Sequence, residues 1–143
     1  MREFDLFGTW AGDCYRPPSP ANEFSVFSLT SGGAVELQNN FGANYDDMVY
    51  RIVDVKRVSR FRLSLRQLLT TDDRIVLDTV ILRAADRIRT WSSRLADGSA
   101  LVEDGSVPAS NGQETGWKNR CDVRRADGRT APGNPVRRAI ADR

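Results

Sequence analysis

The chain has 143 residues, of which 40% are hydrophobic and 28% charged, and its formal net charge is +2. This length predicts one globular domain with a core of its own, and no apolar run is long enough for a transmembrane helix. Histidine is absent, which excludes Ser-His and Cys-His catalysis and imidazole ligation of zinc or haem. We therefore expect a protein that is not an enzyme, with no catalytic residues, no metal and no cofactor.

Strand signals separated by short turns fill the chain from residue 6 to about residue 105. Proline supplies no N–H to a sheet ladder, so the prolines of residues 17–20 end the first strand, and Ser31-Gly32-Gly33 forms a hairpin turn. We expect strands over residues 7–15, 23–29, 34–38, 48–58, 60–69, 74–83, 87–93 and 100–103, with a candidate ninth over 116–123.

The connections between these strands are too short for crossover helices, which favours an antiparallel meander. The predicted fold is all-β: an antiparallel up-and-down β-barrel of about 8–9 strands, with a domain over residues 1–125. Residues 126–143 form a basic C-terminal tail, either flexible or a short helix.

The positive charge is concentrated near the C-terminus. Residues 118–143 hold eight basic and three acidic side chains, a balance of +5. Contact with nucleic acid or an anionic membrane is one interpretation, and a solvated terminus is the other. The glycines and prolines of this segment favour the second, so we expect no nucleic-acid partner.

Two cysteines, Cys14 and Cys121, lie near the two ends of the strand region. In an up-and-down barrel the first and last strands are neighbours, so a disulfide fits at the seam. Such a bond indicates an oxidising compartment, and we expect a periplasmic or secreted protein, although residues 1–5 lack the apolar segment of a secretory signal. Two buried thiols in a cytoplasmic protein are the alternative.

The first strand carries Gly8-Thr9-Trp10, preceded by Leu6 and Phe7. This Gly-x-Trp resembles the motif that opens the barrel in the lipocalin and fatty-acid-binding (calycin) superfamily, and the chain looks like one of its small bacterial lipocalin-like domains. The resemblance implies that Trp10 closes one end of the barrel, that Gly8 lets the backbone pack closely, and that Arg120 lies against the indole ring. The resemblance covers residues 6 to 123 and does not indicate which ligand the protein binds.

A barrel of eight strands has an interior wide enough for one small apolar or amphipathic molecule. The candidate wall residues are Phe27, Tyr50, Phe61 and Trp91. The alternative is that these side chains fill the interior themselves.

Two charged patterns have alternative interpretations. Arg60, Arg62 and Arg66, joined by Arg87 or Arg89 across the sheet, either bind an anion or form an outer strand face that discourages edge pairing. Three adjacent acidic pairs lie at or beside predicted turns, where Asp is favoured for local hydrogen bonding rather than for catalysis; they are Asp46-Asp47, Asp72-Asp73 and Glu103-Asp104.

The sequence supports two main hypotheses of function. The first is a non-enzymatic module that binds a small apolar or amphipathic ligand in the barrel, as a monomer or weak homodimer. The second is a filled barrel that serves the bacterial envelope as a structural or protein-interaction module. Enzymatic use of the lumen is a third.

Overall fold

The computed structural model describes residues 4–121, which form an all-β fold. Its strands are β1 (Gly8–Ala11), β2 (Phe24–Leu29), β3 (Val35–Asn40), β4 (Met48–Arg57), β5 (Arg62–Leu69), β6 (Asp72–Ala84), β7 (Arg87–Leu95), β8 (Ala100–Val102), β9 (Ser106–Val107), β10 (Gln113–Glu114) and β11 (Lys118–Arg120), with a 3-10 turn, η2, over Pro108–Ser110. The expected tail over 126–143 lies outside the described residues.

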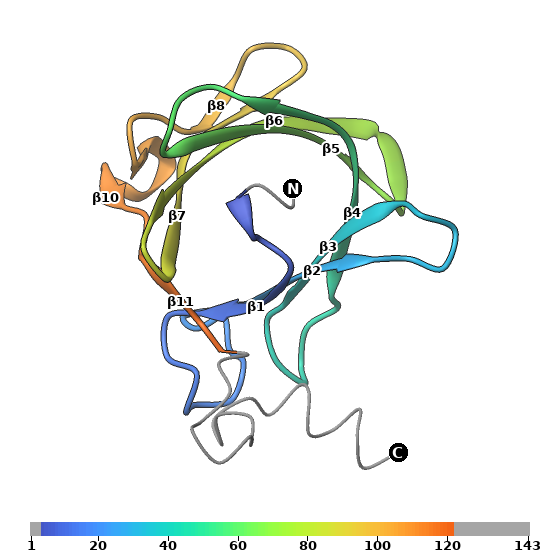
Figure 1. Cartoon of the computed structure of the whole chain (residues 1–143). Coiled ribbons are helices and arrows are strands. Elements are labelled where there is room, and N and C mark those ends of the chain that lie inside the picture. Colours follow the sequence, from blue (N-terminus) through green and yellow to red (C-terminus); the bar gives the residue numbers. More distant parts are fainter. Residues whose placement is uncertain (1–3, 122–143) are drawn as a thin grey trace.

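The predicted antiparallel barrel is confirmed. Strands β1 to β7 pair with their neighbours in sequence order, and β11 pairs with both β1 and β7. This double pairing closes a ring of eight strands, seen end-on in Figure 1. Strand β8 extends the sheet beyond β7, and β9 and β10 form a separate hairpin on the outside of the ring.

The largest differences from the sequence-based expectation lie at the seam. The strand expected over residues 7–15 ends at Ala11, because the chain there leaves the ladder and turns back on itself, with Asn22 bonded to the backbone of Asp13. The strand expected over 116–123 is only Lys118–Arg120. The segment 106–114, for which no strand is expected, contains the β9–β10 hairpin.

A disulfide fastens this short seam. Cys14 follows β1 and Cys121 follows β11, and their Cα atoms are 5.4 Å apart. Both cysteines are buried in a small cluster with Ala11 and Phe24, separate from the main core. The bond therefore joins the two strands that close the barrel.

The main core lies inside the barrel. Its largest member, Trp10, has no exposed surface, and its indole N–H donates to the Leu6 carbonyl at 2.9 Å. The segment before β1 runs inside the ring (Figure 1), where Phe4 and Leu6 join this core. One end of the barrel is therefore closed by the chain's own N-terminal segment.

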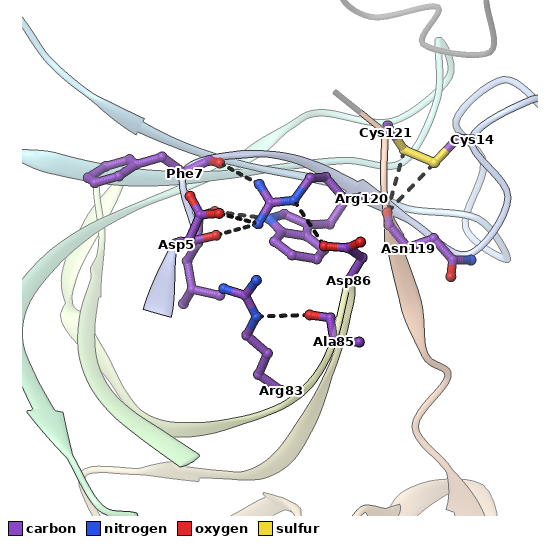
Figure 2. A network of polar contacts seen from close by, with 11 residues as sticks. Asp5, Phe7, Cys14, Arg83, Ala85, Asp86, Asn119, Arg120 and Cys121 are labelled. Atoms are coloured by element: carbon purple, nitrogen blue, oxygen red, sulfur yellow. Dashed lines mark hydrogen bonds and ion pairs between the residues drawn. A yellow bond between two sulfur atoms is a disulfide. The ribbon is translucent and has the colours of Figure 1, made fainter. Parts of the chain in front are cut away.

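Arg120 holds the closed end together. Its guanidinium carbon lies 4.3 Å from the centroid of the Trp10 ring, and its two terminal nitrogens donate to the carbonyls of Phe7 and Asp5. Figure 2 shows the same guanidinium between the carboxylates of Asp5 and Asp86. Gly8 adopts a φ of 123°, a backbone conformation that side chains with a Cβ rarely adopt.

Replacing both cysteines tests the contribution of the seam disulfide. The chain-entropy relation for a loop of about 100 residues gives about 4–5 kcal/mol, so the double variant Cys14→Ser/Cys121→Ser should lose about that much free energy of unfolding in urea. Reduction of the wild-type protein should produce the same loss. Two reactive thiols in the denatured, unreduced protein would contradict the pairing.

Replacing Arg120 tests the clamp at the closed end. Arg120→Lys keeps the charge but loses the forked donor geometry over Trp10, so we expect a loss of about 1–3 kcal/mol, measured by urea unfolding. The control is Arg74→Lys, at an exposed ion pair with Asp72 two residues away on β6, which should change stability little. Equal effects of the two substitutions would contradict the role of Arg120.

Candidate ligand-binding site

The barrel interior contains a cavity of about 460 Å³ that opens at the end opposite Trp10. Its walls come from the inward faces of β2 to β7, and its mouth is formed by residues of the β1–β2 loop and of the segment from β8 to β11. Its lining residues include Glu23, Ser25, Phe27, Asn39, Tyr50, Gln67, Leu77, Thr79, Ile81, Ile88, Ser93 and Lys118. This volume lies in the range of small-molecule sites.

Two of the four expected wall residues lie in this cavity. Phe27 on β2 and Tyr50 on β4 line it, and both are buried. Burial raises the pKa of the Tyr50 phenol, and the nearby negative charge of Glu23 raises it further. Tyr50 therefore presents a neutral hydroxyl to the cavity at physiological pH.

The expectation that Phe61 faces the lumen is wrong. Its side chain is 56% exposed, although Leu63 and Leu65 of the same alternating run are buried. Phe61 belongs to the tight turn before β5, where the amides of Val58 and Ser59 donate to the Arg62 carbonyl. The alternation extends past the end of the barrel, so the side chain has no lumen to enter.

The placement of Trp91 in the wall of the lumen is also wrong. Opposite β7, Ile81 pairs with Thr90 but Val80 pairs with Ser92, so Trp91 is an extra residue in a β-bulge. Ile88 and Thr90 line the cavity, so alternation already places Trp91 on the opposite face, and the bulge then turns Ser93 rather than Ser92 inward. Trp91 lies on the outer side, where Arg62 and Arg89 stack on its ring at 4.9 and 5.7 Å.

The outer arginines are used in stacking and ion pairs with the protein itself. Arg89 also stacks on Trp117 and donates to the Gly105 carbonyl, while Arg87 stacks on Trp117 at 4.8 Å. Arg66 pairs with Asp78. The five arginines of the expected row therefore do not form one anion site, and those near β8 to β10 fasten that segment to the barrel wall.

Polar side chains that the sequence analysis did not single out lie at the mouth of the cavity. The Lys118 ammonium group donates to the Glu23 carboxylate and to the Ser25 hydroxyl, both at 2.6 Å. The Ser25 hydroxyl donates onward to Asn39 Oδ1 at 2.8 Å. The position of Ser25 was open to prediction, since it shares the face of Phe27, but Glu23 and Lys118 are 95 residues apart and meet only when the barrel closes.

Further polar groups lie within the cavity. The hydroxyls of Thr79 and Ser93 are 3.1 Å apart on neighbouring strands. Gln67 on β5 is buried, and its Oε1 has no hydrogen-bond partner within residues 4–121. An unsatisfied buried acceptor costs about 1–3 kcal/mol. The lumen is therefore apolar in part, with a connected polar group at its mouth and an unpaired amide in its wall.

The acidic pairs have local structural roles. Asp72 accepts from the guanidinium and the backbone N–H of Arg74, which lowers the pKa of Asp72, and Glu103 pairs with Arg94.

Over the described part of the chain, no group of three or more His, Cys, Asp or Glu side chains is arranged to hold a metal ion. Nor do residues 4–121 include a helix with the length and apolarity needed to cross a bilayer.

Comparison with protein-family models, with curated proteins and with solved structures finds no match.

The ion pair at the mouth predicts a specific pH dependence. Burial lowers the pKa of Lys118 below its usual 10.5, and Glu23 offsets part of that shift. The unfolded chain therefore binds a proton that the folded protein lacks between the lowered pKa and 10.5, so stability should rise with pH across this window. Urea unfolding between pH 7 and 10.5 measures this slope, which Lys118→Met should reduce.

Removing the negative charge of Glu23 should enlarge the pH dependence of stability that Lys118 causes. Glu23→Gln deprives Lys118 of its partner, which lowers the pKa of Lys118 further and extends the window to lower pH. The two side chains are 19% and 35% exposed, so we expect a loss at pH 7 of about 1–2 kcal/mol, below the value for a fully buried pair. Identical pH profiles for Glu23→Gln and wild type would contradict the coupling.

Proposed function

We propose that the protein is a non-enzymatic binding module that holds one small amphipathic molecule inside the barrel. The observation that carries this proposal is the cavity of about 460 Å³, which is closed at the Trp10 end and open at the Lys118 end. A site with apolar walls and a few polar groups is the usual form of a small-molecule pocket. The same cavity disfavours the alternative of a filled barrel in the bacterial envelope.

A place in the lipocalin and fatty-acid-binding superfamily forms part of this proposal. It is supported by the closed ring of eight antiparallel strands and by the stacking of Arg120 on Trp10 next to Gly8. Folds of this kind serve many functions, so the cavity rather than the fold carries the functional argument.

The proposal of binding without catalysis depends on which titratable groups reach the cavity. Glu23 and Lys118 neutralise each other in an ion pair, and Tyr50 keeps its proton because its pKa is raised. None of these three is thereby prepared as a base or a nucleophile at neutral pH.

We further propose that the protein works in an oxidising compartment, the periplasm or the cell exterior. The support is the disulfide between Cys14 and Cys121, because such bonds are rare in the reducing cytoplasm.

Titration with the neutral fluorescent probe N-phenyl-1-naphthylamine tests ligand binding. We expect a saturable rise in fluorescence with one probe per chain, and a higher melting temperature in its presence. Native mass spectrometry of the purified protein checks for a co-purified molecule of similar size.

Two neighbouring substitutions locate the bound probe. Ser93 faces the cavity and pairs with Thr79, whereas Ser92 pairs with Val80 on the outer face. Ser93→Leu occupies part of the cavity and should weaken probe binding about tenfold, or about 1.4 kcal/mol. Ser92→Leu is the matched control and should leave the affinity unchanged. Absence of probe binding, or equal effects of the two variants, would contradict a site in the lumen.

A further inference from the structure

Gln67 interrupts an otherwise apolar row in the barrel interior. The inward positions of β5 are Leu63, Leu65, Gln67 and Leu69, all buried, and Gln67 is only 4% exposed. Leucine at this position would continue the row. A buried polar atom without a partner opposes folding, and within the described chain Gln67 Oε1 is the one buried side-chain nitrogen or oxygen in that condition. The unpaired amide therefore needs an explanation other than stability.

The surroundings of Gln67 are apolar or uncharged. It pairs across the sheet with Ile52 and Leu77, and it lies in the same cavity wall as Tyr50 and Thr79. The Thr79 hydroxyl is already matched with Ser93. No hydrogen bond among the described residues supplies a donor to the Gln67 oxygen, and the cavity is the open space beside this side chain.

The charges of the cavity favour a neutral ligand. The Lys118 ammonium group is already bonded to Glu23 and Ser25 at the mouth, and the guanidinium of Arg89 is bonded to Thr115 and Gly105. A carboxylate or ammonium head at Gln67 would lose its water without gaining an opposite charge, which is strongly unfavourable.

The Gln67 amide also restricts which head group the ligand can carry. A half-turn about the last side-chain bond of Gln67 exchanges its oxygen and its NH₂ group. A hydroxyl both donates and accepts, so it satisfies the amide in either orientation. The neutral Tyr50 phenol, which can also donate or accept, offers a second partner in the same cavity.

We propose that Gln67 is the recognition residue for the head group of the ligand, and that the ligand is an uncharged, mainly apolar molecule carrying a hydroxyl. This inference rests on the proposed function and specifies its ligand class. The mouth then admits the ligand past a self-neutralised ion pair, and the apolar side chains around Gln67 contact its hydrocarbon part.

A series of ligands with the same chain length tests the head group in the wild-type protein. 1-Octanol, octanoate and octylammonium are titrated at pH 7.5 as competitors of N-phenyl-1-naphthylamine. We expect octanol to bind at least tenfold more tightly than either ion. If octanoate or octylammonium binds as tightly as octanol, the inference is wrong while ligand binding in the lumen stands. If neither the probe nor any competitor binds, the proposed function fails and this inference fails with it.

The variant Gln67→Leu separates recognition from a structural role. It should weaken octanol binding about tenfold and probe binding by clearly less, while the melting temperature of the ligand-free protein rises because the unpaired group is gone. The control is Gln113→Leu, on the exposed strand β10, which should change neither quantity. A lower melting temperature together with equal losses for probe and octanol would assign Gln67 a structural role and overturn the inference.

Discussion

The closure of the barrel depends on a contact of three residues. Strand β11 spans only Lys118–Arg120, yet it has to pair with β1 on one side and with β7 on the other. A ladder this short supplies few hydrogen bonds, and short strands are individually marginal. Each of its ends is therefore reinforced: Cys121 follows it with the disulfide, Arg120 stacks on Trp10, and Lys118 reaches across β1 to Ser25.

The same short strand separates the two ends of the barrel chemically. Along β11, Arg120 points to the indole and the carbonyls of the N-terminal segment, where its donors are satisfied. Two residues earlier, Lys118 points to the same interior but meets Glu23 at the mouth. Side chains two apart on a strand share one face. One face of β11 thus supplies the clamp of the closed end and the polar group of the open end.

More of the fold than of the candidate site could be predicted from the sequence. Alternation and turn residues indicate the strands, and Cys14, Trp10 and Arg120 indicate where the ring closes. The failures are local. Trp91 lies on the outer side, on the face opposite Ile88 and Thr90, and the sequence pattern does not show the bulge beside it in β7. Phe61 belongs to a turn beyond the barrel end. Gln67 was visible as a polar residue on the face of Leu63 and Leu65, but its lack of a partner appears only when the neighbouring strands are placed.

The position of Cys14 in the chain places seven strands of the ring inside the disulfide-closed loop and leaves one strand outside it. The disulfide closes a macrocycle from residue 14 to residue 121, which includes every strand of the ring except β1, since β1 ends at Ala11. Strand β1 thus lies outside the disulfide loop and is held to β2 and β11 by non-covalent contacts. It is also the strand that carries the Trp10 plug. The other seven strands of the ring therefore lie within one disulfide-closed loop, and the strand that carries Trp10 lies outside it.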